Sequence, residues 1–287
     1  MNRFLCIRRG ALGDTLWMIP VLRAMRARDP AAELCFAGVT EYAGLLRAYG
    51  VVDRAMSSED LELWSLASGG DGSDRARARL GGYRWIISDQ TGPEVARGVD
   101  VEVRCFDPSA LAADGPAPAQ LLAQVGLLGA GVDAVPWLRA ERVPVERGAS
   151  VMLHPGSGSP AKCWPWRRWV ELADRLTRAG RSVEVVLGEA EVGRPDLKIE
   201  QLPSTARLME GLDLPDLAAH VERARCFVGN DSGVTHLAAA LKVPTVAVFG
   251  PTDPAVCAPQ GDHVTVIGGV TDGPPDADVV SVFAAVP

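Results

Sequence analysis

Short apolar runs alternate with longer amphipathic segments along most of the chain, a pattern typical of parallel sheets built from strand–helix units. In the first half, the runs that predict strands are residues 4–7, 34–37 and 84–88. In the second half, they are residues 151–154, 183–187, 226–228 and 245–249. The expected fold class is therefore α/β, with two Rossmann-like, doubly wound domains facing a central cleft.

Apolar side chains at helical spacing predict where the helices lie. A helix beginning near Asp14 is predicted by apolar residues three positions apart: Leu16, Ile19, Leu22 and Met25. Pro20 falls inside this segment, so it either kinks the helix or marks its true start. Pro165 is expected to open another helix, which Gly180 ends. Two more helices are expected over residues 214–223 and 234–241.

The length of 287 residues suits two domains of about 140 residues each. A stretch that contains proline and glycine, residues 143–148, separates the two halves. We therefore expect one domain over residues 1–145 and a second over residues 146–287. In sheets of this kind, ligands bind at the carboxyl ends of the strands.

Composition argues against several classes of protein: nucleic-acid-binding, membrane-spanning, disulfide-linked and metal-binding. The net charge of −7 argues against a nucleic-acid partner. No apolar run reaches the roughly 18 residues that a membrane span needs, and the first apolar stretch is too short for a signal peptide, so we expect a cytoplasmic protein. The six cysteines are scattered, with no CxxC pair and no nearby histidine cluster, so we expect neither disulfides nor a metal site.

The first candidate site is the turn GALGD at residues 10–14, directly after a predicted strand. Its two glycines let the backbone turn sharply toward a ligand. Asp14 then lies at or beside a helix N-terminus, where an aspartate often serves only as a cap. The spacing G-x-x-G differs from the dinucleotide fingerprint G-x-G-x-x-G, so an NAD site is not indicated.

Three further strand ends carry polar, glycine-rich loops. HPGSGSPAKCWP (154–165) places Lys162 before a helix, which suits an anion-binding loop; the alternative is a flexible surface loop. GNDSGVTH (229–236) leads into a helix whose first amides favour a phosphate; the alternative is that Asp231 caps the helix and His236 packs in the core. FGPTDP (249–254), taken alone, is better explained as a structural proline turn.

Together and in this order, these four motifs resemble glycosyltransferase family 9, the ADP-heptose:lipopolysaccharide heptosyltransferases. The resemblance implies a GT-B fold, with an acceptor site on the first domain and a nucleotide-sugar site on the second. It also implies an inverting transfer of heptose or a related sugar from an ADP-linked donor, with no cofactor and no metal. The implied acceptor is a saccharide or lipid-saccharide such as lipopolysaccharide core, met at the cytoplasmic face of the inner membrane.

The resemblance also implies residue roles. Asp14 matches the family's general base, and Lys162 matches the residue that neutralises the diphosphate. The remaining donor-binding candidates are Ser157 and Gly158 near the phosphates, Glu191 at the ribose, Leu212 at the adenine, and Asp231, Ser232, Gly233 and His236 in the loop that grips the nucleotide-sugar. Candidates on the acceptor side are Gly13, Gln90, Arg75 and Arg77.

The two arginines have a second interpretation, because a run of charge is often a solvated helix face. Two other functions remain open for the whole chain. One is a nucleotide-sugar epimerase or hydrolase, which would turn over the donor without an acceptor. The other is a non-catalytic nucleotide-sugar-binding protein, which would bind the donor without transferring the sugar.

Overall fold

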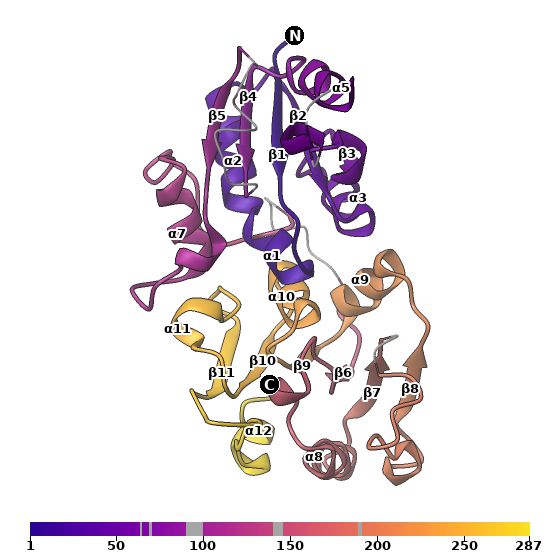
Figure 1. Cartoon of the computed structure of the whole chain (residues 1–287). Helices are drawn as coiled ribbons and strands as arrows, with labels where there is room; N and C mark the ends of the chain where they lie inside the picture. The colour runs from indigo at the N-terminus through magenta and orange to yellow at the C-terminus, as the bar shows by residue number, and fades with distance from the viewer. Residues whose placement is uncertain (64, 69–70, 90–99, 140–145, 189–190) are drawn as a thin grey trace. The chain divides into compact units, whose positions relative to one another are not determined.

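The computed structural model describes residues 1–63, 65–68, 71–89, 100–139, 146–188 and 191–287. The chain divides into two compact units, Met1–Ala140 and Glu141–Pro287, each built around a parallel sheet (Figure 1). The α/β fold class expected from the sequence is confirmed.

The first unit has a five-stranded sheet in the order β3-β2-β1-β4-β5. Its strands are β1 (Arg3–Ile7), β2 (Glu33–Gly38), β3 (Arg54–Ser57), β4 (Trp85–Ser88) and β5 (Glu102–Cys105). Its described helices are α1 (Leu12–Trp17), α2 (Ile19–Arg28), α3 (Thr40–Ala48), α4 (Ser65–Ser68), α5 (Asp71–Leu80) and α7 (Ala117–Gln124).

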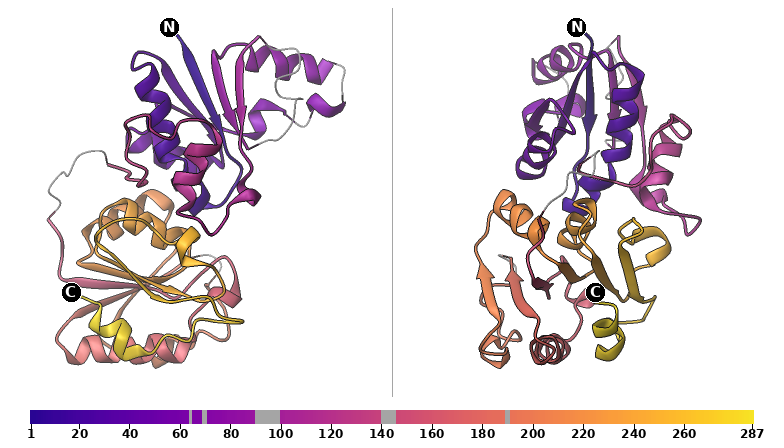
Figure 2. Two further views of the ribbon diagram at one scale, coloured as in Figure 1. Left: turned by 90° about the vertical axis from the view of Figure 1, so that its left-hand side faces the viewer. Right: turned by 180° about the vertical axis from the view of Figure 1, so that it is seen from behind.

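The second unit has a six-stranded sheet in the order β11-β10-β9-β6-β7-β8. Its strands are β6 (Ser150–His154), β7 (Ser182–Leu187), β8 (Arg207–Glu210), β9 (Cys226–Asn230), β10 (Thr245–Phe249) and β11 (Val264–Gly268). Its helices are α8 (Trp166–Arg178), α9 (Leu214–Arg223), α10 (Gly233–Ala240), α11 (Pro254–Cys257) and α12 (Val279–Ala284). Helices α8 and α12 cover one face of this sheet, and α9 and α10 cover the other (Figure 2).

Each sheet has one topological switch point, where the strand order reverses. In the first sheet it lies between β1 and β4, where Ile7 pairs with Ser88. In the second it lies between β6 and β9, where His154 pairs with Gly229. Loops that leave neighbouring strands in opposite directions open a crevice at such a point, so the fold assigns one potential ligand-binding edge to each unit.

Two buried tryptophans fix the chain just after the β6 loop. The rings of Trp164 and Trp169 pack edge to face with centroids 5.2 Å apart. The indole N–H of Trp164 donates to the Ala277 carbonyl at 2.9 Å, and that of Trp169 donates to the Trp164 carbonyl at 3.1 Å. Because a buried indole N–H is costly without a partner, these bonds define where the loop must end.

The structure refines several helix boundaries. Pro20 marks a true start, because α1 ends at Trp17 and α2 begins at Ile19. Pro165 lies one residue before α8, as its N-cap. The outer strands β3, β5, β8 and β11 were not predicted from the sequence. All four are edge strands, and β3, β5 and β8 have weak apolar periodicity because they carry charged residues. The sequence of β11, VTVIG, is apolar and β-branched, and its pattern was overlooked.

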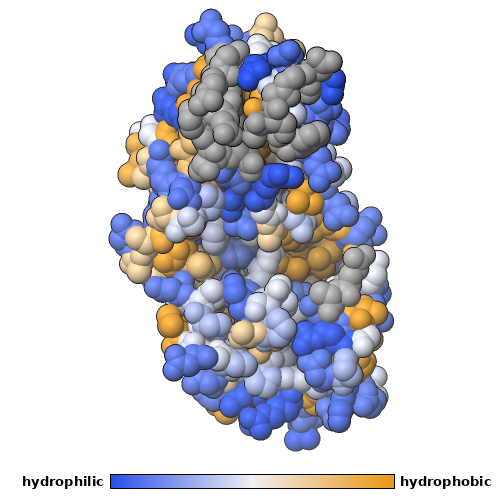
Figure 3. All heavy atoms as spheres, in the orientation of Figure 1, coloured by the Kyte–Doolittle hydropathy of each residue, from blue (hydrophilic) through white to orange (hydrophobic). Residues whose placement is uncertain are grey.

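Of the helices in the described residues, none is long and apolar enough to cross a membrane. The visible face of the molecule is mostly hydrophilic, with apolar side chains in small groups (Figure 3). Cys6, Cys35 and Cys226 are buried in strands β1, β2 and β9.

Candidate functional site

The predicted donor residues gather at one edge of the second sheet. They follow the carboxyl ends of four adjacent strands: Ser157, Gly158 and Lys162 after β6, Glu191 after β7, Leu212 after β8, and Asp231, Ser232, Gly233 and His236 after β9. The structure therefore brings these residues to the switch point and its neighbouring strand ends, where the topology expects a ligand.

The centre of this edge is a charged cluster around Asp231. The ammonium of Lys162 lies 2.7 Å from Asp231 Oδ2, and the hydroxyl of Thr252 donates to the same oxygen at 2.6 Å. The Asp231 side chain is 7% exposed and that of Lys162 is 31% exposed, so the cation faces outward from a buried carboxylate. Thr252 was not predicted as a site residue, since its motif FGPTDP, taken alone, fits a structural proline turn.

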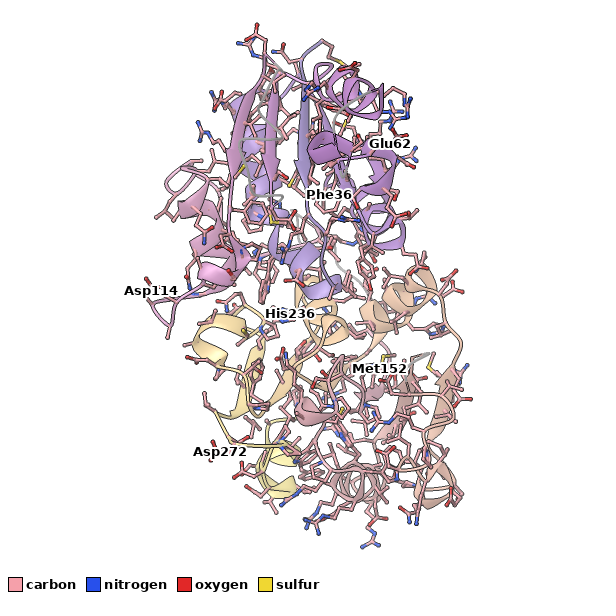
Figure 4. The ribbon with its side chains drawn as sticks, in the orientation of Figure 1. Phe36, Glu62, Asp114, Met152, His236 and Asp272 are labelled. Carbon is pink, nitrogen blue, oxygen red and sulfur yellow. The ribbon has the colours of Figure 1, made fainter. Side chains whose placement is uncertain are left out.

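The start of α10 provides a second positive feature at the same place. Ser232 is the N-cap, and its hydroxyl accepts from the Thr235 N–H at 3.4 Å, so the alternative that Asp231 caps the helix is wrong. His236 lies buried in the first turn (Figure 4), with Nε2 3.9 Å from Asp231 Oδ1. The first backbone amides of α10 and the helix dipole favour a bound anion here.

The loop after β6 is held in place by the end of β9. The Asn230 side chain accepts from the Trp164 N–H at 2.9 Å and donates to the Pro155 carbonyl at 2.7 Å. The Ser157 hydroxyl donates to the Asp231 carbonyl at 2.7 Å. These bonds tie the segment before Lys162 to the strand across the switch point, so the alternative of a loose surface loop does not hold. Asn230 was not singled out from the sequence, although it precedes Asp231 in the same motif.

Glu191 is buried against Gly156 in the loop that follows β6. A Cβ added at Gly156 would lie 2.3 Å from Glu191 Cδ, so only glycine leaves room for this carboxylate. Glu191 Oε2 accepts from the Gly188 N–H at 3.0 Å and lies 4.0 Å from His154 Nε2. Burial lowers the pKa of His154 to about 4, so this imidazole is neutral at physiological pH.

Leu212 and Gly158 occupy looser positions. Leu212 is partly exposed in the turn between β8 and α9. Gly158 is exposed, and a Cβ added there would meet nothing within 4 Å. Packing alone therefore does not demand a glycine at residue 158, in contrast to Gly156.

The first unit has a second charged cluster at its own switch point. Asp14 is the third residue of α1, not its N-cap, and its Oδ2 accepts from the Ala11 N–H at 2.9 Å. Its Oδ1 lies 2.6 Å from Nη2 of Arg8, whose Nη1 lies 3.0 Å from Asp89 Oδ2. Asp14 thus supports the helix start and also belongs to an ion-pair cluster that spans β1 and β4.

Arg8 and Asp89 were not predicted as site residues. The one available signal was their position, since each directly follows a buried strand at the carboxyl edge of the sheet. Gly13 lies buried in the first turn of α1, beside Asp14.

The structure gives less support to an acceptor-binding role for the other three candidates, Arg75, Arg77 and Gln90. Arg75 Nε lies 3.5 Å from Glu62 Oε2, and Arg77 Nη1 lies 3.4 Å from Asp74 Oδ1 (Glu62 is labelled in Figure 4). Both arginines on α5 therefore have carboxylate partners, which agrees with a solvated helix face. Gln90 lies outside the described residues.

Across the described ranges, no group of three or more His, Cys, Asp or Glu side chains is arranged to hold a metal ion. The arrangement in the second unit is suited to binding a diphosphate through an ammonium and helix-terminal amides. The arrangement in the first unit offers an oriented, 30% exposed carboxylate, which is the kind of group that removes a proton from a hydroxyl.

Comparison with known proteins gives consistent matches. The model of glycosyltransferase family 9 (heptosyltransferase) matches residues 130–283, which include the cluster around Asp231 and not Asp14. Lipopolysaccharide heptosyltransferase 1 of Pseudomonas aeruginosa is 37% identical over 118 residues, 41% of this chain and 33% of that protein. Lipopolysaccharide heptosyltransferase 2 of Escherichia coli K12 is 35% identical over 118 residues, 39% of this chain and 34% of that protein. The alignments thus span about a third of these curated relatives.

Among solved structures, the ADP-heptose lipopolysaccharide heptosyltransferase II of Escherichia coli is similar with a TM-score of 0.74 at 22% identity. The match covers 99% of this chain and 97% of that chain. At this identity the likeness establishes the fold, which is GT-B, as the sequence resemblance implied.

Proposed function

Because this chain belongs to glycosyltransferase family 9, the heptosyltransferase family, we propose that it transfers a heptose from an ADP-linked donor to a saccharide acceptor such as lipopolysaccharide core. The observation that carries the proposal is the cluster at the second switch point. There the Lys162 ammonium lies 2.7 Å from Asp231 Oδ2, and the Ser232-capped start of α10 directly follows Asp231 in the chain. The names of the aligned relatives, lipopolysaccharide heptosyltransferases, support the same sugar and acceptor.

In this proposal the donor lies along the carboxyl edge of the second sheet. Its diphosphate binds Lys162 and the first amides of α10, because both favour negative charge. The ribose binds the buried carboxylate of Glu191, and the adenine lies against Leu212, at the ends of the next two strands. Asp231 and His236 lie at the end of the bound donor that carries the heptose.

The proposed reaction is a single displacement that inverts the anomeric carbon. Asp14 takes the proton from an acceptor hydroxyl, whose oxygen forms a bond to the anomeric carbon. The bond between that carbon and the β-phosphate oxygen breaks, and ADP leaves with the electron pair. Lys162 and the α10 amides stabilise the developing charge, which is the task that a divalent cation performs in other transferases.

The acceptor would bind on the side of the first unit, near Asp14 and Gly13. A lipid-linked acceptor brings the enzyme to the cytoplasmic face of the inner membrane as a peripheral protein. The net charge of −7 supports a saccharide acceptor over a nucleic acid.

Transfer can be tested by incubating the protein with ADP-heptose and a heptose-free lipopolysaccharide core saccharide, with mass spectrometry of the products. The proposal expects the acceptor to gain one heptose and ADP to appear in equal amount. Donor turnover without an acceptor would indicate the epimerase or hydrolase function. ADP binding without any transfer would indicate a binding protein. Under each of these functions, ADP should raise the melting temperature of the protein, because it binds only the folded state.

The location of the donor can be tested by hydrogen exchange with ADP. Protection is expected in the loop after β6 and at the start of α10, because these backbone segments surround the proposed diphosphate. Protection confined to the first unit would contradict the donor assignment.

A further inference from the structure

Arg8 lies between two carboxylates, and the proposed reaction uses only one of them. Its Nη2 donates to Asp14 Oδ1 at 2.6 Å, and its Nη1 donates to Asp89 Oδ2 at 3.0 Å. The Asp89 side chain is 5% exposed and that of Arg8 is 8% exposed. Taking an ion pair out of water carries a large desolvation cost. A buried pair in contact with the partly exposed carboxylate of Asp14 therefore needs an explanation beyond stability.

The backbone holds this pair at the ends of three adjacent strands. The Arg8 N–H donates to the Ala37 carbonyl of β2 at 3.0 Å, and the Asp89 N–H donates to the Ile7 carbonyl of β1 at 3.2 Å. The Arg9 N–H adds a third bond, to Asp89 Oδ2 at 3.0 Å. Both residues are therefore fixed to the rigid centre of the sheet.

Through its hydrogen bonds, the Arg8 guanidinium fixes the orientation of the Asp14 carboxylate. Its donors lie in one plane at fixed angles, so a bond from Nη1 to Asp89 also determines where Nη2 points. Asp14 Oδ1 is bound by Nη2, while Oδ2 is bound by the Ala11 N–H. Both oxygens are anchored, yet a carboxylate has about four acceptor positions, so each oxygen can still accept a proton.

Charge balance gives the second carboxylate a further role. When Asp14 accepts a proton, it becomes neutral and no longer balances the buried guanidinium. Asp89 supplies a counter-charge that remains in place throughout the reaction. Without Asp89, protonation of Asp14 would leave an unpaired buried cation, which is strongly unfavourable.

We propose that Arg8 and Asp89 are positioning residues that hold the Asp14 carboxylate in the geometry of a general base. The inference rests on the proposed function, since it assigns Asp14 the proton transfer. The competing explanation is an ion pair that only stabilises the first unit.

Another aspartate of the first unit, Asp53, offers a control with the same bonding pattern. Asp53 Oδ2 accepts from Arg26 Nη2 at 2.6 Å and from the Leu34 N–H at 2.7 Å, the same combination of one guanidinium and one backbone amide that Asp89 has. Asp53 lies before β3, at the amino end of the sheet, away from the carboxyl edge that holds Asp14. The Asp53 side chain is 48% exposed and that of Arg26 is 31% exposed, so this pair shares the bonding pattern of Asp89 and Arg8 but not their burial. An Asp53→Asn variant therefore removes the same bonding pattern without touching the site.

The kinetic test compares Asp89→Asn with Asp53→Asn in the transfer assay. Asp89→Asn should lower kcat roughly 10²-fold, the scale of a misplaced reacting group, while the Kd for ADP stays at the wild-type value. Asp53→Asn should keep kcat. Arg8→Lys keeps the charge but lacks the planar fork, so its kcat should fall as well, and it carries the test if Asp89→Asn does not fold. Wild-type kcat in either folded variant would overturn the proposal.

A crystal structure of each variant gives a readout that does not depend on activity. The proposal expects the Asp14 carboxylate to leave its wild-type position, or to lose its Arg8 contact, in Asp89→Asn and Arg8→Lys. An Asp14 that keeps both anchors in these variants would contradict it. If the wild-type protein transfers no heptose, the proposed function fails, and the crystal structures still decide whether Arg8 and Asp89 position Asp14.

Discussion

Lys162 and Asp231 meet at 2.7 Å across the switch point of the second sheet, although 69 residues separate them in the chain. The Thr252 hydroxyl binds the same carboxylate oxygen at 2.6 Å, so three loops converge on one atom. Asp231 thereby keeps the ammonium in place before any ligand arrives. A preorganised charge stabilises a leaving diphosphate without further rearrangement, which is the most effective form of electrostatic catalysis.

Lys162→Ala is expected to cut kcat for transfer by roughly 10²–10³, the scale for losing one preorganised charge stabiliser. The Kd for the donor should change less, because negative charge builds on the diphosphate as the bond breaks. Steady-state kinetics and ADP calorimetry separate the two effects. Lys198→Ala, an exposed lysine of the same unit, is the control and should keep both values. A raised KM with unchanged kcat would mean that Lys162 serves binding alone.

Gly156→Ala should weaken ADP binding roughly 10- to 100-fold, because the new Cβ displaces the Glu191 carboxylate and costs a hydrogen bond to a charged group. Gly44→Ala in α3 of the first unit is the control, since its Cβ would also meet nothing within 4 Å. Calorimetric titration with ADP measures both. Equal affinities in the two variants would argue against a role of Glu191 in holding the nucleotide.

His154 should make the protein sensitive to acid. Burial lowers its folded-state pKa to about 4, whereas in the unfolded chain it is near 6.5. Between these values the unfolded chain binds a proton that the folded chain does not, so the free energy of unfolding falls as pH drops. The loss from this residue is about 2 kcal/mol at pH 5 relative to pH 7.

Urea unfolding of the wild type and His154→Gln at pH 7 and pH 5 measures this difference. The variant should lose less stability on acidification than the wild type, by about that amount. His220→Gln, a partly exposed histidine on α9, is the control and should follow the wild type. Parallel pH dependence in wild type and His154→Gln would show that the buried histidine is not the cause.

The sequence predicted the central strands and the position of the polar loops at their ends, for a physical reason. Buried strands such as β9 and β10 are continuous apolar runs, and the glycine-rich loops that follow them stand out in composition. Helix α12 was harder to predict, because its sequence VVSVFA is rich in β-branched residues. Its helix begins at the Asp278 cap and packs on α8, so tertiary contact and capping override propensity.

The site was predictable where residues are neighbours in sequence and not where the fold brings them together. Lys162, Asp231 and Asp14 were found within their motifs. Arg8 and Asp89 are 81 residues apart, so their ion pair depends on the register of β1 with β4. Thr252 reaches Asp231 in the same way, through the neighbouring strand β10.

The most direct test of the whole account is transfer by Asp14→Asn with ADP binding measured on the same sample. The amide cannot accept the acceptor's proton, so transfer from ADP-heptose should fall by roughly 10²–10⁴, the usual contribution of a general base. Asp89 still pairs with Arg8, so the variant should fold, and its Kd for ADP should match the wild type because the donor binds the second unit. Near-normal transfer by folded Asp14→Asn would contradict the assignment of Asp14 as the base of a heptosyltransferase.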